Sequence, residues 1–155
     1  MFRYNFIKIL SNENRLHECE LVLIKHCPEE TITYHTLYFY CKKASYLITI
    51  ESTSKSIETL IGNNEKTSNN VYFTLINLIK LFKAKIIKIV IFNSGNCHLS
   101  VECELKKFQI HTALEDALII AKLCNCKMYI TENLLNDLGI KITKELLEKA
   151  LNTKS

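Results

Sequence analysis

Very short connections between strand-like segments constrain the fold of this chain most strongly. Residues 86–92, 97–105 and 108–111 are rich in β-branched and aromatic side chains, and only residues 93–96 and 106–107 separate them. Connections of this length join antiparallel neighbours, whereas parallel strands need a crossover of about a dozen residues or more. The sequence therefore predicts an α+β fold in which a mostly antiparallel sheet packs against helices.

The first half of the chain continues the strand pattern. Four further segments are predicted as strands, at residues 2–10, 20–26, 31–42 and 47–51. A short helix is expected over residues 54–61, with Gly62 as a left-handed stop. Residues 63–70 are polar and predict a loop. Because the composition does not change after this loop, we expect residues 1–155 to form a single domain.

Apolar residues at helical spacing predict the helices of the second half. Residues 71–83 should form a largely buried helix with an apolar stripe of Val71, Leu75, Leu78, Ile79 and Phe82. Residues 113–124 should form another, with an inward stripe of Leu114, Ala117, Leu118 and Ala121. A strand at 128–131, a helix at 132–138 ending at Gly139, and a terminal helix at 143–151 complete the pattern.

Composition indicates a globular chain in a reducing compartment. Hydrophobic residues make up 48% of the sequence, with one Pro and three Gly, which excludes disordered and collagen-like classes. No apolar run approaches the roughly 20 residues of a membrane span, and residues 1–10 do not have the pattern of a signal peptide. Seven scattered cysteines predict buried free thiols in the cytoplasm, and their spacing indicates no metal site.

The net charge of +4 comes almost entirely from lysine, since arginine occurs only twice. Lysines cluster around the start of the segment 86–92, and a phosphate backbone would be attracted to such a patch. We therefore assign Lys83, Lys85 and Lys88 as candidate nucleic-acid-binding residues. The alternative is an ordinary solvated surface, because lysine is abundant throughout the chain and no aromatic platform or named motif is evident beside the cluster.

Residues 110–121, followed by residues 128–140, resemble the closing signature of the bifunctional nuclease family. Asp116 and Ala117 match an Asp-Ala pair of that signature. The other characteristic polar or turn residues of the family are replaced, at His111, Ala113, Leu114 and Glu115. The resemblance covers about residues 19–140. Upstream, Asn77 matches within residues 74–79, while Val71, Tyr72 and Phe73 stand where the family has Thr, His and Asp.

This resemblance implies a divergent nuclease that hydrolyses phosphodiester bonds of DNA or RNA. Such an enzyme would use a divalent cation such as Mg²⁺. Relatives in the family look dimeric, and the aromatic segment 34–40 is our candidate for a homodimer contact. The alternative is a catalytically inactive, dimeric binding or regulatory module on the same fold, because most polar residues of the signature are absent.

His111, Glu115 and Asp116 form the best candidate catalytic group. In this interpretation His111 is the general base, Asp116 orients it or binds a metal, and Glu115 lies beside them at a helix N-terminus. A structural interpretation competes with it and is favoured. Thr112 and Glu115 have the spacing of a capping box, and Asp116 would complement the helix dipole.

Overall fold

The computed structural model describes residues 15–62 and 71–152 of the chain, so the predicted strand at residues 2–10 and the loop at 63–70 lie outside the described residues. The α+β fold is confirmed. Its first part consists of β1 (Leu16–Cys27), β2 (Tyr34–Cys41), β3 (Tyr46–Ser52) and α2 (Ser56–Ile61). The second part begins with α3 (Val71–Leu81), β4 (Lys85–Ile91), β5 (Asn96–Cys103) and β6 (Lys106–Ala113). It ends with α4 (Leu114–Cys124), β7 (Lys127–Thr131), α5 (Glu132–Leu138), β8 (Ile140–Lys141) and α6 (Lys144–Asn152).

The described strands form one eight-stranded sheet in the order β6-β5-β4-β7-β1-β2-β3-β8. Neighbours in this sheet are antiparallel except for the parallel pair β4 and β7. Between the two strands of the parallel pair the chain passes through β5, β6 and α4, and β7 then returns beside β4. The mainly antiparallel sheet follows from the short hairpin connections.

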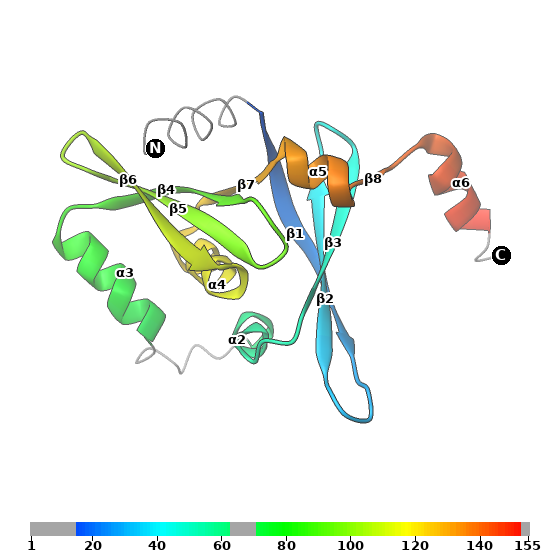
Figure 1. Ribbon diagram of the computed structural model, residues 1–155, viewed down its shortest axis with the longest axis horizontal. Helices are drawn as coiled ribbons and strands as arrows, with labels where there is room; N and C mark the ends of the chain where they lie inside the picture. The colour runs from blue at the N-terminus through cyan, green and yellow to red at the C-terminus, as the bar shows by residue number, and fades with distance from the viewer. Residues whose placement is uncertain (1–14, 63–70, 153–155) are drawn as a thin grey trace, which may run out of the picture.

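Strand β1 belongs to both halves of the sheet. Its first residues, Leu16 to Cys19, pair with β7, and the stretch from Glu20 to Cys27 pairs with β2. A register shift lies between Leu21 and Leu23, where β1 bends. As a result β1, β2 and β3 run across the direction of β4, β5 and β6 (Figure 1).

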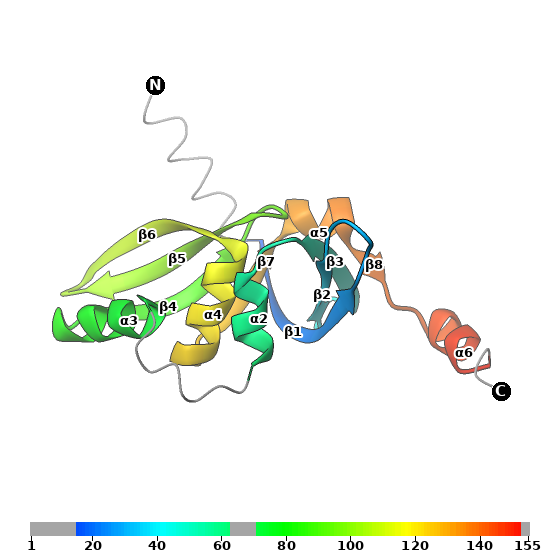
Figure 2. The ribbon, with the colours of Figure 1, turned by 90° about the horizontal axis from the view of Figure 1, so that it is seen from below.

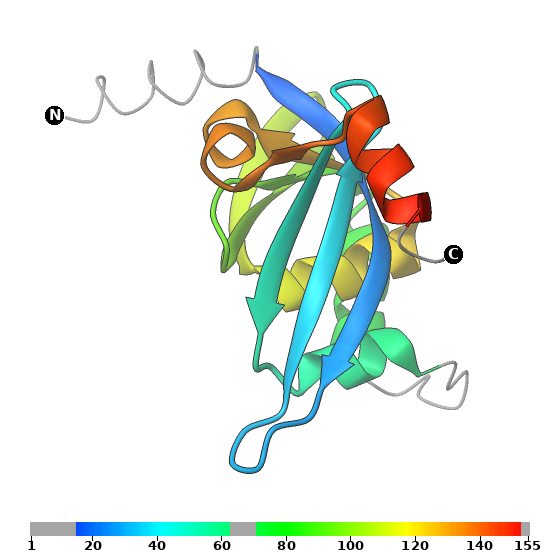
Figure 3. The same cartoon turned by 90° about the vertical axis from the view of Figure 1, so that its right-hand side faces the viewer.

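Helix α4 fills the angle between the two halves. Its predicted inward stripe is buried, and Ile119 and Ile120 are buried as well. Ala117 and Ala121 have small side chains, which lets the helix lie close to its neighbours. Helices α2, α3 and α4 all lie on one side of β4, β5 and β6 (Figure 2), and α2 and α4 lie behind β1, β2 and β3 (Figure 3). The other side of the β4–β6 region is free of described helices.

Helix α3 is much more exposed than predicted. Ile76 is its only buried side chain, while Val71 is 78% and Leu78 46% exposed. Phe82, just beyond the helix, is 70% exposed. Most of the expected apolar stripe therefore faces outward, although Ile79 is partly buried beside Ile76. Periodicity indicated an amphipathic helix but did not indicate which face the protein covers.

The β5–β6 hairpin turns two residues earlier than predicted. Glu104 and Leu105 form the turn with φ values of 49° and 68°, and Lys106 is already paired with Cys103. Two consecutive positive φ values are typical of the type I′ turn that suits a two-residue hairpin. Leu105, the last residue of the predicted strand 97–105, consequently lies in the turn and is 95% exposed. The prediction was wrong because Glu and Leu seldom occupy left-handed positions.

Three smaller expectations also change. Gly62 ends α2 with a φ of −69°, so it is not a left-handed stop. Only Cys19, Cys41 and Cys97 are buried thiols, and the other four cysteines are partly exposed. Strand β2, the candidate dimer contact, lies inside the sheet between β1 and β3, and Phe39 is fully buried. Homodimer formation stays a prediction.

Within residues 15–62 and 71–152, no helix is both long and apolar enough to cross a membrane.

Helix α5 matches its predicted bounds, and at its start the Thr131 hydroxyl accepts a hydrogen bond from the Leu134 amide at 3.4 Å. Gly139 ends the helix and connects it to β8, the short strand that pairs with β3.

We predict that Gly139→Ala destabilises the fold by about 1–3 kcal/mol, because overpacking a filled site costs energy of this order. A Cβ atom there would lie against the Leu135 carbonyl and 2.8 Å from Cδ1 of Tyr46. Gly95→Ala is the matched control, since the nearest atom to its added Cβ is 4.0 Å away. Urea denaturation of both variants measures the difference, and equal stabilities would contradict the prediction.

Candidate functional site

The side of β4, β5 and β6 that no described helix covers, continued onto β7, carries a distinctive group of polar and aromatic side chains. Cys97, Leu99 and Val101 of β5 are buried toward the helices. Since side chains alternate along a strand, the residues between them point to the opposite side. The cross-strand pairs show which residues of β4, β6 and β7 lie on the same side as these β5 residues. We call it the open face; its members are Lys85, Lys88, Val90, His98, Ser100, Glu102, Lys107, Gln109, His111, Lys127 and Tyr129.

One end of the open face is a cluster of rings. His98 lies opposite His111 on β6 and opposite Val90 on β4, and Val90 lies opposite Tyr129 on β7. Phe92, just after β4, stacks on His98 with ring centroids 4.4 Å apart. The His111 ring is 5.5 Å from Phe92 and 5.6 Å from His98. The rings of Phe92, His98 and His111 form one cluster, and the buried Val90 lies between His98 and Tyr129.

His98 is the most confined member of the ring cluster. Burial lowers its pKa, and the neighbouring His111 lowers it further, because both disfavour a second positive charge at this place. Its Nδ1 atom is buried and has no hydrogen-bond partner within the described chain. His98 is therefore held mainly as a neutral ring at neutral pH, which suits it to stacking.

The other end of the open face is basic. The register shift between Ile86 and Lys88 puts both Lys85 and Lys88 on this face, opposite Glu102 and Ser100. Lys107 lies opposite Glu102 from the other side, and Lys127 lies opposite Lys88.

Lys88 connects the two ends, because its Nζ atom lies 5.8 Å from the centre of the Tyr129 ring. Part of the charge is balanced locally, since Lys127 Nζ is 3.2 Å from Glu18 Oε1. The predicted Lys83 stands apart from this face, in the turn after α3, with a φ of 55°.

Glu115 and Asp116 have structural partners on the helix-covered side. Glu115 Oε1 accepts a hydrogen bond from the Ser52 hydroxyl at 2.5 Å, and Asp116 Oδ1 accepts one from the Tyr72 hydroxyl at 2.6 Å. These bonds connect the first turn of α4 to β3 and to α3. The desolvation of Tyr72 and its bond to Asp116 raise the pKa of its phenol.

The predicted capping box is not formed. The cap residue of α4 is Ala113, and no side chain caps the helix. The Thr112 hydroxyl donates instead to the Ile110 carbonyl at 3.4 Å, within β6. The prediction failed because β6 continues one residue beyond Thr112, and Glu115 is used by Ser52.

The three predicted catalytic residues are divided between two sides of the sheet. His111 lies on the open face with His98, whereas Asp116 and Glu115 bond to residues on the side of the helices. The structure thus brings Glu115 and Asp116 together but does not place His111 with them. Their assignment as a catalytic group stays a prediction. Among residues 15–62 and 71–152, no three His, Cys, Asp or Glu side chains are grouped to hold a metal ion.

Sequence reasoning found Lys85, Lys88 and His111 of the open face but missed the other rings. Phe92, His98 and Tyr129 come from three separate segments, and only the strand order makes them neighbours. The alternation of His98 with Cys97 and Leu99 was a usable signal for its side of the sheet. The order of β4 and β7, which brings Tyr129 beside Lys88, could not be obtained from that pattern.

Comparison of the chain with models of known protein families finds no match, and comparison with curated proteins finds none either. The resemblance to the bifunctional nuclease family therefore receives no support from them and stays a prediction.

We predict that His98 makes the fold less stable as the pH falls. Its folded pKa lies below the ordinary value of about 6.5, so the unfolded chain takes up the proton first. The free energy of unfolding should therefore decrease as the pH falls through about 6.5 toward the folded pKa. His98→Phe, which keeps a ring but cannot titrate, should show a smaller decrease in urea denaturation at about pH 7 and pH 5. An unchanged decrease would contradict the assignment.

Proposed function

We propose that this chain is a non-catalytic binding module that takes up single-stranded nucleic acid on the open face. The observation that carries this proposal is the juxtaposition of the ring cluster with the lysines on neighbouring strands, on the side of β4, β5 and β6 that no described helix covers. Proteins that bind single strands combine these two elements, because bases stack on rings while lysines attract the phosphates. This arrangement favours the module over the divergent nuclease.

The spacing of the two ends suits a single strand. His98 and Glu102 are four residues apart on β5, which is about 13 Å at roughly 3.3 Å per residue. A strand of about four nucleotides or more could therefore stack on Phe92 and Tyr129 and also reach Lys85 and Lys88. The lysines would bind phosphates without reading the base sequence.

The hydrogen bonds made by the two acidic residues argue for nucleic-acid binding rather than cleavage. Phosphodiester hydrolysis needs groups that activate a nucleophile and stabilise developing charge at one point. Glu115 and Asp116 instead accept hydrogen bonds from Ser52 and Tyr72, away from the open face. His111 is left among rings, where stacking is the simplest role.

We expect Phe92→Ala and Tyr129→Ala each to weaken binding of a fluorescent single-stranded oligonucleotide by about 5- to 100-fold, as expected for loss of one base–ring stack. Fluorescence anisotropy at low salt measures this with both RNA and DNA. Phe108→Ala is the matched control, because Phe108 is 51% exposed on the other side of β6 and should leave the affinity unchanged.

The same oligonucleotides test cleavage. Incubation with Mg²⁺ or Mn²⁺, and with chelator, should leave them intact under the module proposal. Metal-dependent cleavage that disappears in His111→Ala would instead support the nuclease. Absence of binding at low salt, or an equal loss in Phe108→Ala, would contradict the open face as a nucleic-acid site.

A separate prediction concerns the lysines. Replacing Lys83, Lys85 and Lys88 together by Ala should weaken binding more than His111→Ala does, since the interaction is mainly electrostatic. A plot of log affinity against log salt should become shallower by about 0.7 for each phosphate that the variant no longer neutralises. Lys42, Lys43 and Lys55 lie outside the open face, so their triple replacement is a charge-matched control. Equal effects of the two triple variants would reject a localised site.

A further inference from the structure

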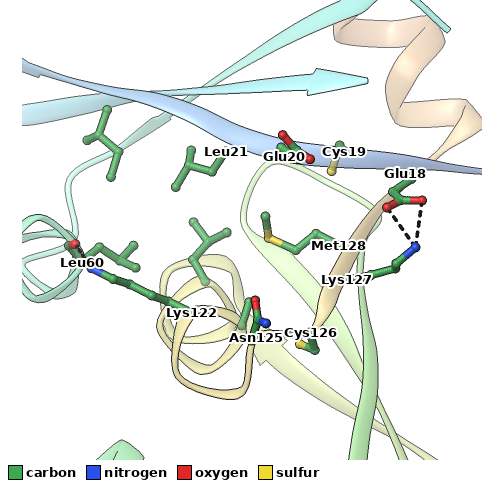
Figure 4. A pocket seen from close by; sticks show the side chains of 13 residues that line it. Glu18, Cys19, Glu20, Leu21, Leu60, Lys122, Asn125, Cys126, Lys127 and Met128 are labelled. Atoms are coloured by element: carbon green, nitrogen blue, oxygen red, sulfur yellow. Dashed lines mark hydrogen bonds and ion pairs between the residues drawn. The ribbon is translucent and has the colours of Figure 1, made fainter. Parts of the chain in front are cut away.

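A hollow lies on the helix side of the sheet, where β1 and β7 face α2 and α4 (Figure 4). Its volume is about 720 Å³, which is within the roughly 300–1,000 Å³ of small-molecule sites. Its walls are part aliphatic and part polar. The aliphatic part is formed by Leu21 and Ile24 of β1, Leu60 of α2, Leu118 and Ala121 of α4, and Met128 of β7. Cys19, Asn125 and Cys126 also line the hollow.

Lys122 supplies the unbalanced charge of this hollow. Its side chain extends along the wall, and Nζ donates to the Leu60 carbonyl at 2.9 Å (Figure 4). An ammonium group has three N–H donors, so this bond leaves others for a ligand. Glu18 and Lys127 at the edge pair with one another. Glu20 is exposed and alternates with Cys19 and Leu21, so its carboxylate points to the other side of β1.

We infer that this hollow binds a small amphipathic carboxylate, with its alkyl chain on the aliphatic wall and its acid group on Lys122. Burial of each methylene favours binding, and a charge-assisted hydrogen bond fixes the acid end. The aliphatic wall lies on the side of the sheet that the helices cover, and Lys127 at the edge of the hollow also belongs to the open face.

Decanoate, titrated below its micellar concentration by isothermal calorimetry, is the direct test. Saturable binding of one molecule per chain is expected, together with a rise in melting temperature, because a ligand that binds only the folded state stabilises it. Lys122→Met keeps the aliphatic stem and should weaken decanoate by about tenfold or more, with decanol unaffected. Lys80→Met on α3 is the matched control and should bind decanoate like the unmodified chain.

A filling variant tests the place of the alkyl chain. Ile24→Trp should abolish binding of both decanoate and decanol by occupying the hollow, whereas Val22→Trp should not, because Val22 is 51% exposed and does not line it. Circular dichroism confirms that each variant is folded. Absence of saturable decanoate binding, equal affinities in Lys122→Met and Lys80→Met, or undiminished binding by folded Ile24→Trp would overturn the inference.

Discussion

The burial of α4 is the interaction on which the rest of this structure depends. The helix lies in the angle of a bent sheet, where Leu114, Leu118 and Ile120 are nearly or fully inaccessible to solvent. Burying a side chain of this size contributes about 1.5–3 kcal/mol. Because α2 and α3 both pack on α4, and β4 and β5 lie above it, the helix sets the separation of the remaining elements. Gathering α2, α3 and α4 on one side of β4, β5 and β6 also leaves the other side of these three strands uncovered by any described helix.

The first turn of α4 explains why a pair of acids need not indicate an active site. Glu115 and Asp116 stand at a helix N-terminus, where their charge is favoured by the helix dipole. Each also accepts a hydrogen bond from another element, Glu115 from Ser52 of β3 and Asp116 from Tyr72 of α3. The acids therefore hold three segments together that are distant in the sequence. Asp116, which matches the nuclease signature, and Glu115, which departs from it, are both used here as structural connectors.

Local pattern was sufficient for the fold class and for most elements. The helix 132–138 was predicted at its observed bounds, and the inward stripe of α4 was correct, because in α4 the sheet covers the face that carries the apolar residues at helical spacing. Three features were beyond reach for physical reasons. The Glu104–Leu105 turn needs positive φ values, which non-glycine residues seldom adopt. The exposure of α3 depends on what lies opposite the helix, and the ring cluster depends on the order of the strands.

The position of β1 has a consequence for how the chain acquires its fold during synthesis. The stretch from Leu16 to Cys19 pairs with Met128 to Thr131, more than a hundred residues later, whereas β1, β2 and β3 can pair locally as soon as they are made. The edge of β1 that pairs with β7 must therefore stay unpaired on a ribosome until β7 has emerged. Closing so long a loop is entropically slow, and an unpaired strand edge can associate with other chains. The interval before β7 arrives is when a nascent chain of this protein is most exposed to misassembly.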